Sequence, residues 1–216
     1  MPVAPVVTPI RSGRRSRIRL VRSALGAALA AVVVAGVSGC ASDPVSDSFL
    51  SGDNTGYVAA DGAVVEIPAA DRGEPVVFGG VTEGGEQFSS ADIAGQVVVV
   101  NFWYAGCAPC RGEAEHLEAT WQKFEDQGVT FIGINTRDQA DTAKAFAVDY
   151  AVTYPSLIDV DTAEAKLAFA EAVPIQATPT TLVLDKQGRV AARIIGPIDS
   201  PSILSTLVKD ALAETS

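Results

Sequence analysis

The clearest hydrophobic pattern in the chain covers residues 97–103, a mostly β-branched run that only Asn101 interrupts. Such a run is typical of a strand that is buried on both faces of a sheet, so we expect a central parallel strand here. Apolar residues then recur at helical spacing over residues 109–127, and Gly128 follows them, which predicts a helix and its end. A second apolar run at residues 129–134 completes a strand, helix, strand unit.

Shorter patterns flank this unit. Before it we expect two short strands and a Gly-rich hairpin or edge structure, at residues 64–67, 75–78 and 79–85. After it we expect a helix, a strand, a short helix, a hairpin and a last helix, at residues 141–150, 154–158, 163–170, 180–195 and 200–213. Strands and helices in this order predict an α/β fold in which helices flank a central mixed β-sheet.

The composition is that of an ordinary globular protein, since 48% of the 216 residues are hydrophobic and 19% are charged. The length suits one medium domain with accessory segments. Six arginines and no acidic residue precede Cys40, whereas 10 basic and 26 acidic residues follow it, which leaves a net charge of −16 beyond Cys40. A body this acidic repels phosphate backbones, so we expect no nucleic-acid partner.

The first 40 residues have the pattern of an export signal. Their arginines precede a small-apolar run, residues 24–37, which is too short to span a bilayer comfortably. A Val-Ser-Gly-Cys segment that ends at Cys40 resembles a bacterial lipoprotein box, in which the cysteine becomes the lipidated first residue. We therefore expect residues 1–40 to be a lipoprotein signal peptide and Cys40 to carry a two-chain lipid anchor. An uncleaved anchor helix and a plain secreted form are the alternatives.

Residues 41–62 are rich in Ser, Asp and Gly and show no sustained apolar period, which predicts a flexible tether. One folded domain should then cover residues 63–216. With the lipid anchor, this domain would lie at the extracytoplasmic face of the cell membrane.

Candidate chemistry lies in the segment Cys107-Ala108-Pro109-Cys110, where the buried strand ends and the helix begins. Backbone N–H groups and the positive end of the helix dipole face the first sulfur there and favour the thiolate, the form that attacks a disulfide. Cys110 heads the apolar stripe of the helix, whereas Cys107 precedes it. We therefore expect Cys107 to be exposed and to attack, and Cys110 to be covered and to resolve the mixed disulfide.

A Cys-x-x-Cys pair is also half of a zinc site or a simple structural disulfide. A zinc site needs four ligands, but the chain has no second cysteine pair. Its only histidine, His116, lies six residues beyond Cys110 and so about 240 degrees around a helix from it. A zinc site is therefore disfavoured, whereas a structural disulfide remains an alternative.

Residues 101–110 and the later segment Ala177-Thr178-Pro179-Thr180 together resemble the thioredoxin superfamily. The resemblance is to its exported, membrane-anchored TlpA/ResA-like oxidoreductases, which have a redoxin domain of the AhpC/TSA type. It extends over residues 64–213 and implies a thioredoxin-like fold with an N-terminal hairpin extension and a central insertion within residues 141–161. It also implies that Pro179 is a cis proline against the active-site disulfide. By the same resemblance, Thr178, Pro109 and Ala108 would contact the substrate.

Two positions depart from the wider family. Minimal thioredoxins have a buried Asp where this chain has Asn101, and an amide cannot take up a proton during exchange. Glu113, three residues beyond Cys110, is the candidate acid, because ResA-like proteins have a glutamate at that spacing. The alternative for Glu113 is a solvent-facing acid near a helix N-terminus. The second departure is Gly106, where the family usually has Trp.

These features predict a thiol-disulfide oxidoreductase that reduces disulfides in exported proteins and uses its cysteine pair with no further cofactor. Ala108 and Pro109 supply no base that would stabilise a reduced thiolate strongly, which favours the reductase direction. The resemblance implies a membrane electron donor of the CcdA/DsbD type and exported disulfide substrates, among them apocytochrome c.

A thioredoxin-like fold also suits three other functions. A peroxiredoxin needs a Thr where this chain has Tyr104, and a copper chaperone needs two cysteines four residues apart and a distant His. An anchored binding module or metallochaperone with a structural disulfide is the remaining alternative.

Overall fold

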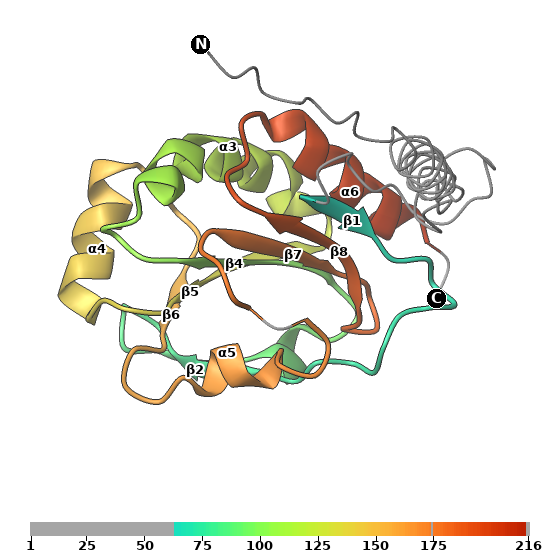
Figure 1. The fold of residues 1–216 in the computed structure, drawn as a ribbon, viewed down its shortest axis with the longest axis horizontal. Coiled ribbons are helices and arrows are strands. Elements are labelled where there is room, and N and C mark those ends of the chain that lie inside the picture. Colours follow the sequence, from blue (N-terminus) through green and yellow to red (C-terminus); the bar gives the residue numbers. More distant parts are fainter. Residues whose placement is uncertain (1–62, 174, 215–216) are drawn as a thin grey trace, which may run out of the picture. The chain divides into compact units, whose positions relative to one another are not determined.

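A computed structural model describes residues 63–173 and 175–214 of the chain (Figure 1). The expected signal peptide, Cys40 and the expected tether lie outside these residues. Within the described part, no helix is long and apolar enough to cross a membrane.

A six-stranded mixed sheet forms the centre of the domain, in the order β1-β8-β7-β4-β5-β6. Its strands are β1 (Val64–Glu66), β4 (Val97–Trp103), β5 (Val129–Asn135), β6 (Ser156–Ile158), β7 (Thr180–Leu184) and β8 (Val190–Ile195). The central strand β4 pairs in parallel with β5 and antiparallel with β7. All seven residues of β4 are buried, which confirms the strand that the unbroken apolar run predicts.

Helices cover both faces of this sheet. They are η1 (Ser90–Ile93), α3 (Ala108–Phe124), η2 (Glu125–Gln127), α4 (Ala140–Asp149), α5 (Glu164–Ala168) and α6 (Pro201–Ala213). Figure 1 shows α3 and α6 together on one side of the sheet and α5 on the other. A hydrophobic core lies on each face of the sheet, because successive side chains of a strand point to opposite faces. Val97 and Val99 of β4 pack in the core on the α3 and α6 side, whereas Val98 and Val100 pack in the core on the α5 side.

A two-stranded sheet of β2 (Gly79–Val81) and β3 (Gln87–Ser89) forms the expected N-terminal hairpin. Its turn reaches the β6 edge of the main sheet, where Thr82 forms an isolated antiparallel bridge with Leu157. The Glu83 carboxylate accepts a hydrogen bond from the Ser156 N–H at 2.8 Å, and the Glu83 N–H donates to the Ser156 carbonyl at 2.9 Å.

Residues 75–78 form no strand, so the prediction of a strand there is wrong. Val76 and Phe78 are buried in the core on the α5 side, and the Phe78 ring lies 5.0 Å from that of Phe169. Their apolar character reflects burial in that core rather than a place in a ladder. β6 is also shorter than expected, because Pro155 before it has no N–H for the ladder.

Candidate active site

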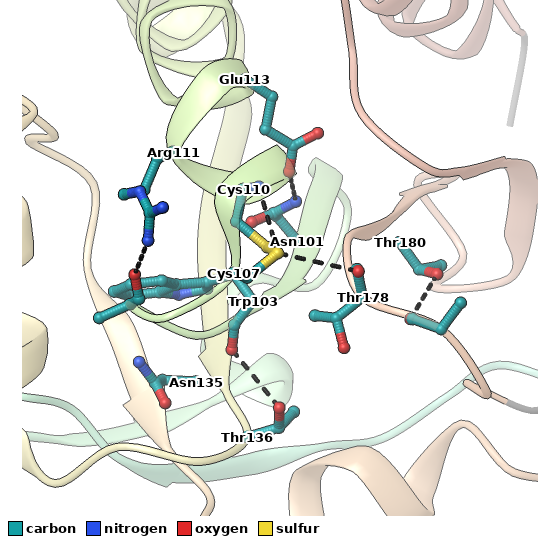
Figure 2. Close-up of a disulfide and its surroundings, with 12 residues drawn as sticks. Asn101, Trp103, Cys107, Cys110, Arg111, Glu113, Asn135, Thr136, Thr178 and Thr180 are labelled. Carbon is teal, nitrogen blue, oxygen red and sulfur yellow. Dashed lines mark hydrogen bonds between the residues drawn. A yellow bond between two sulfur atoms is a disulfide. The ribbon is translucent and has the colours of Figure 1, made fainter.

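The two cysteines lie at the junction between β4 and α3, as a disulfide with a Cα–Cα distance of 5.2 Å (Figure 2). Cys107 is the N-cap residue of α3, and the Cys110 N–H points at the Cys107 Sγ at 3.2 Å. The sulfur of Cys107 therefore lies at the positive end of the helix, where a thiolate is favoured.

Both cysteines are buried, since each is only 3% exposed. The expectation that Cys107 is exposed is therefore wrong for this disulfide form. The loop around Pro179, far along the chain, covers it, and the Thr178 carbonyl oxygen lies 3.8 Å from the Cys107 Sγ. The two sulfurs still differ in surroundings, because Cys107 faces this loop and Cys110 lines an internal pocket. The exposed residues Ala108 and Pro109 leave the rim around the pair open to a partner.

The Thr178–Pro179 peptide bond is cis, as the family resemblance implies. Pro179 is buried and Thr178 is half-buried. Two hydrogen bonds hold the loop: the Gly196 N–H donates to the Pro179 carbonyl at 3.0 Å, and the Thr180 hydroxyl donates to the Ala177 carbonyl at 2.9 Å. The structure thus places a fixed backbone carbonyl beside the disulfide.

Glu113 is completely buried, at 0% exposed, so the solvent-facing alternative is wrong. The Asn101 side-chain amide donates to its Oε1 at 2.8 Å, and the Ile198 N–H donates to its Oε2 at 3.0 Å. Burial raises the pKa of Glu113 to about 7, against these two hydrogen bonds, and the charge of Asp199 adds to the rise. A carboxyl with such a pKa can exchange a proton at neutral pH.

A small pocket lies beside Cys110. Its volume of about 10 Å³ matches a single water molecule. Cys110, Asn101 and Tyr154 are among its lining residues. Burial raises the pKa of Tyr154, and so does the charge of nearby Glu113. Asn101 therefore links the two regions, because it lines the pocket beside Cys110 and also contacts Glu113.

Sequence reasoning missed two charged residues that contact the turn before Cys107. The Asp138 carboxylate accepts a hydrogen bond from the Ala105 N–H at 2.6 Å, and the Arg111 guanidinium donates to the Ala105 carbonyl at 3.0 Å. Asp138 follows β5, whose end lies beside that of β4. Functional side chains gather at the carboxyl ends of neighbouring parallel strands, and this rule could have pointed to Asp138.

Known proteins resemble this chain in sequence and in fold. The sequence profile described as "AhpC/TSA family" matches residues 72–193. The chain belongs to the AhpC/TSA family.

Curated relatives in this family are thiol-disulfide exchange proteins by name. The thiol-disulfide oxidoreductase ResA of Halalkalibacterium halodurans is 29% identical over 106 residues, 49% of this chain and 57% of that protein. The thiol:disulfide interchange protein DsbE of Pseudomonas aeruginosa is 31% identical over 137 residues, 62% of this chain and 72% of that protein. This AhpC/TSA chain thus matches somewhat more than half the length of the first of these relatives.

Solved structures give the same fold. A secreted thiol-disulfide isomerase from Corynebacterium glutamicum superposes with a TM-score of 0.63 at 32% identity, and the match covers 74% of this chain and 98% of the isomerase chain. A thiol:disulfide interchange protein of the thioredoxin family from Chlorobium tepidum gives a TM-score of 0.61 at 32% identity, and the match covers 68% of this chain and all of the Chlorobium chain. The AhpC/TSA domain therefore has the thioredoxin-like fold that the sequence motifs imply.

Proposed function

We propose that this protein is an extracytoplasmic thiol-disulfide oxidoreductase that reduces disulfides in exported proteins through Cys107 and Cys110. The observation that carries the proposal is the position of the Cys107 sulfur, at the N-cap of α3 and 3.8 Å from the Thr178 carbonyl oxygen. A disulfide that served only to hold the fold would not need the Thr178 carbonyl, fixed by the cis Thr178–Pro179 bond, beside it. The names of the ResA and DsbE relatives support the same reaction class.

The reaction begins with the reduced pair. The Cys107 thiolate attacks one sulfur of the substrate disulfide, so that a Cys107–substrate disulfide forms and the other substrate sulfur leaves as a thiolate. Cys110 then loses its proton and attacks the Cys107 sulfur, which restores the Cys107–Cys110 disulfide and releases the second substrate sulfur. The substrate gains two electrons and two protons. A membrane thiol donor of the CcdA/DsbD type would return two electrons to the pair.

Five further residues have roles in this proposal. Glu113 takes the proton of Cys110, because its pKa of about 7 lets it accept and release a proton near neutrality. Pro179 holds the Thr178 backbone beside Cys107, where an extended substrate segment can bind it. Ala108 and Pro109, which are exposed, complete the substrate contact.

Insulin reduction with dithiothreitol as the electron source tests the activity. The wild-type chain should accelerate the reaction, and Cys107→Ser should abolish the acceleration. Cys40→Ser is the matched control, because it removes a cysteine without touching the pair, and it should stay fully active. An inert wild type whose disulfide resists dithiothreitol would instead support a structural disulfide.

A trapping experiment tests the roles of the two sulfurs and the partners. Cys110→Ser should accumulate a mixed disulfide between Cys107 and its substrate, because the resolving sulfur is missing. Apocytochrome c among the captured proteins would support a role in cytochrome c maturation. If only Cys107→Ser captured partners, the assigned roles would be reversed.

A lipid anchor at Cys40 would keep the domain at the membrane where its electron donor lies. The support is the sequence alone: arginines, a short apolar run and the Val-Ser-Gly-Cys segment. Cell fractionation tests it, since the wild type should remain with membranes and Cys40→Ser should lose the acyl mass on that residue. An unmodified N-terminal peptide in the wild type would refute the anchor.

A further inference from the structure

The turn between β4 and α3 is held at one residue, Ala105, by two oppositely charged side chains. The Ala105 N–H donates to the Asp138 Oδ2 at 2.6 Å, and the Arg111 Nη1 donates to the Ala105 carbonyl at 3.0 Å. Figure 2 shows the Arg111 side chain extending from α3 to that oxygen. Hydrogen bonds to charged groups are shorter and stronger than neutral ones, so the contacts restrain the turn from both sides.

Each of the two side chains is itself anchored. The Asp138 Oδ2 also accepts from the Asn135 side-chain amide at 3.0 Å, and the Asn135 Oδ1 accepts from the Asp138 N–H at 2.8 Å. Asn135 is the last residue of β5 and is 0% exposed. Arg111 lies in the first turn of α3, and its N–H donates to the Cys107 carbonyl at 3.2 Å. The turn is thereby tied to a buried strand on one side and to the active-site helix on the other.

The position of Cys107 depends on this turn. Its N–H donates to the Tyr104 carbonyl at 3.1 Å, so a shift of the Tyr104–Ala105 segment would move the cysteine backbone. A third charged side chain, Arg137, stacks over the Tyr104 ring at 4.3 Å and reaches the turn from the β5–α4 loop. The neighbouring Gly106 is exposed and has no side chain to restrain the turn.

We propose that Arg111 and Asp138 are positioning residues that fix the backbone of Ala105 and thereby keep the Cys107 sulfur aligned with the N-terminus of α3. The functional meaning rests on the proposed oxidoreductase activity, because alignment with the helix end favours the attacking thiolate. Neither side chain is assigned a direct contact with substrate.

The opposite charges of the two residues allow a sharp test. If they acted on Cys107 only through space, removal of the Arg111 cation would raise the pKa of the Cys107 thiol, and removal of the Asp138 anion would lower it. If they act by position, both removals release the same turn and raise this pKa. The double variant should then raise this pKa hardly more than the larger single variant does, because both contacts restrain the backbone at the same residue, Ala105.

The measurement is the rate of iodoacetamide alkylation of Cys107 against pH, in the reduced full-length chain, with the adduct quantified by peptide mass spectrometry. We expect Arg111→Ala and Asp138→Ala each to raise the apparent pKa of Cys107 by about half a unit to one unit, which lowers the thiolate fraction about 3- to 10-fold below that pKa. Asp138→Asn should recover most of the wild-type value, since its amide oxygen still accepts from Ala105. Shifts of opposite sign, or none, would overturn the proposal.

Matched controls come from α4, where Asp141→Ala and Lys144→Ala remove exposed charges of the same two signs and should leave the profile unchanged. Arg111→Lys keeps the positive charge but replaces the planar guanidinium donors with an ammonium group. This variant replaces Arg111→Ala in the test if Arg111→Ala fails to fold. Alkylation needs no substrate disulfide. A wild type inert toward insulin would therefore contradict the proposed function and leave this test intact.

Discussion

Two of the buried carboxyl groups of the domain, those of Glu113 and Asp185, behave in opposite ways. Glu113 beside the cysteine pair is 0% exposed, and Asp185 in the turn between β7 and β8 is 1% exposed. Burial raises the pKa of Glu113 to about 7. Burial also pushes the pKa of Asp185 upward, but hydrogen bonds from the Arg189 N–H and from the Arg72 and Arg189 guanidinium groups outweigh it and lower that pKa.

The difference lies in the charge of the partners. The donors to Glu113 are a side-chain amide and a backbone N–H, both neutral. Asp185 accepts from Arg72 and Arg189, each at 2.9 Å, and the Arg72 side chain is only 5% exposed. A carboxylate between two guanidinium groups stays ionised and acts as a structural anchor. A carboxyl with neutral partners changes its protonation near pH 7 and can serve in proton transfer.

The largest expected effect is on stability, from removal of the anchor. Asp185→Ala should lower the free energy of unfolding by about 3–5 kcal/mol, because the buried carboxylate accepts hydrogen bonds from the backbone N–H groups of Gln187 and Arg189 and from the guanidinium groups of Arg72 and Arg189. Urea unfolding measures the loss, and Asp126→Ala, an exposed acid in η2, is the control. A loss below about 1 kcal/mol would mean that solvent screens the network as it screens surface ion pairs.

The pH dependence of stability should separate the two carboxyl groups next. Between pH 4.5 and pH 7, an unfolded chain loses the proton of Glu113 while the folded chain keeps it, so rising pH destabilises the fold. The free energy of unfolding of the wild type, relative to Glu113→Gln, should therefore fall by about 3 kcal/mol from pH 4.5 to pH 7.5 and stay level above that.

Asp185 should show the opposite sign. Its lowered pKa contributes stability that is present above the unfolded value near 4 and is lost as the pH falls. Urea unfolding of Asp185→Asn against the wild type at pH 3–8 measures this. Parallel pH profiles for the Glu113 and Asp185 variants would remove the distinction between the two groups.

The exchange reaction should respond to Glu113 with a smaller effect. Glu113→Gln should slow insulin reduction about 10- to 100-fold near pH 7, because Cys110 loses its proton acceptor, and should remove the inflection near that pH. The measurement is kcat/KM over pH 5.5–9. Glu115→Gln, an exposed acid on the same helix, is the control. An unchanged profile in Glu113→Gln would show that the proton leaves by another route.

The smallest expected effect concerns the pocket. Tyr154→Phe removes a hydroxyl that lies near Glu113 and lines the pocket with Cys110, so the Glu113 carboxyl loses a polar neighbour. The inflection in the exchange rate should move to higher pH by less than about one unit. The same rate measurement checks this, with Tyr150→Phe as the control. A loss as large as that of Glu113→Gln would instead make the Tyr154 hydroxyl the main proton route.

Sequence patterns predicted the central elements well where burial was continuous. The bounds of β4, β7 and β8 follow from runs rich in apolar and β-branched residues, and the spacing of Glu113 from Cys110 pointed to the buried acid. Burial of Cys107 could not be predicted from its own segment, because the covering loop lies 71 residues away at Thr178. The contacts of Asp138 and Arg111 with Ala105 depend on side-chain geometry at a sheet edge, which no local pattern encodes.

The hairpin turn against β6 has a consequence for aggregation. An open strand edge recruits extended chains by backbone pairing, and this is a common start of aggregation. Here Thr82 bridges Leu157, and Glu83 occupies both backbone groups of Ser156, so this short edge strand offers little template to an extended chain. The β6 edge is thereby protected against pairing with the strand of another molecule, which lessens the risk of aggregation at this edge.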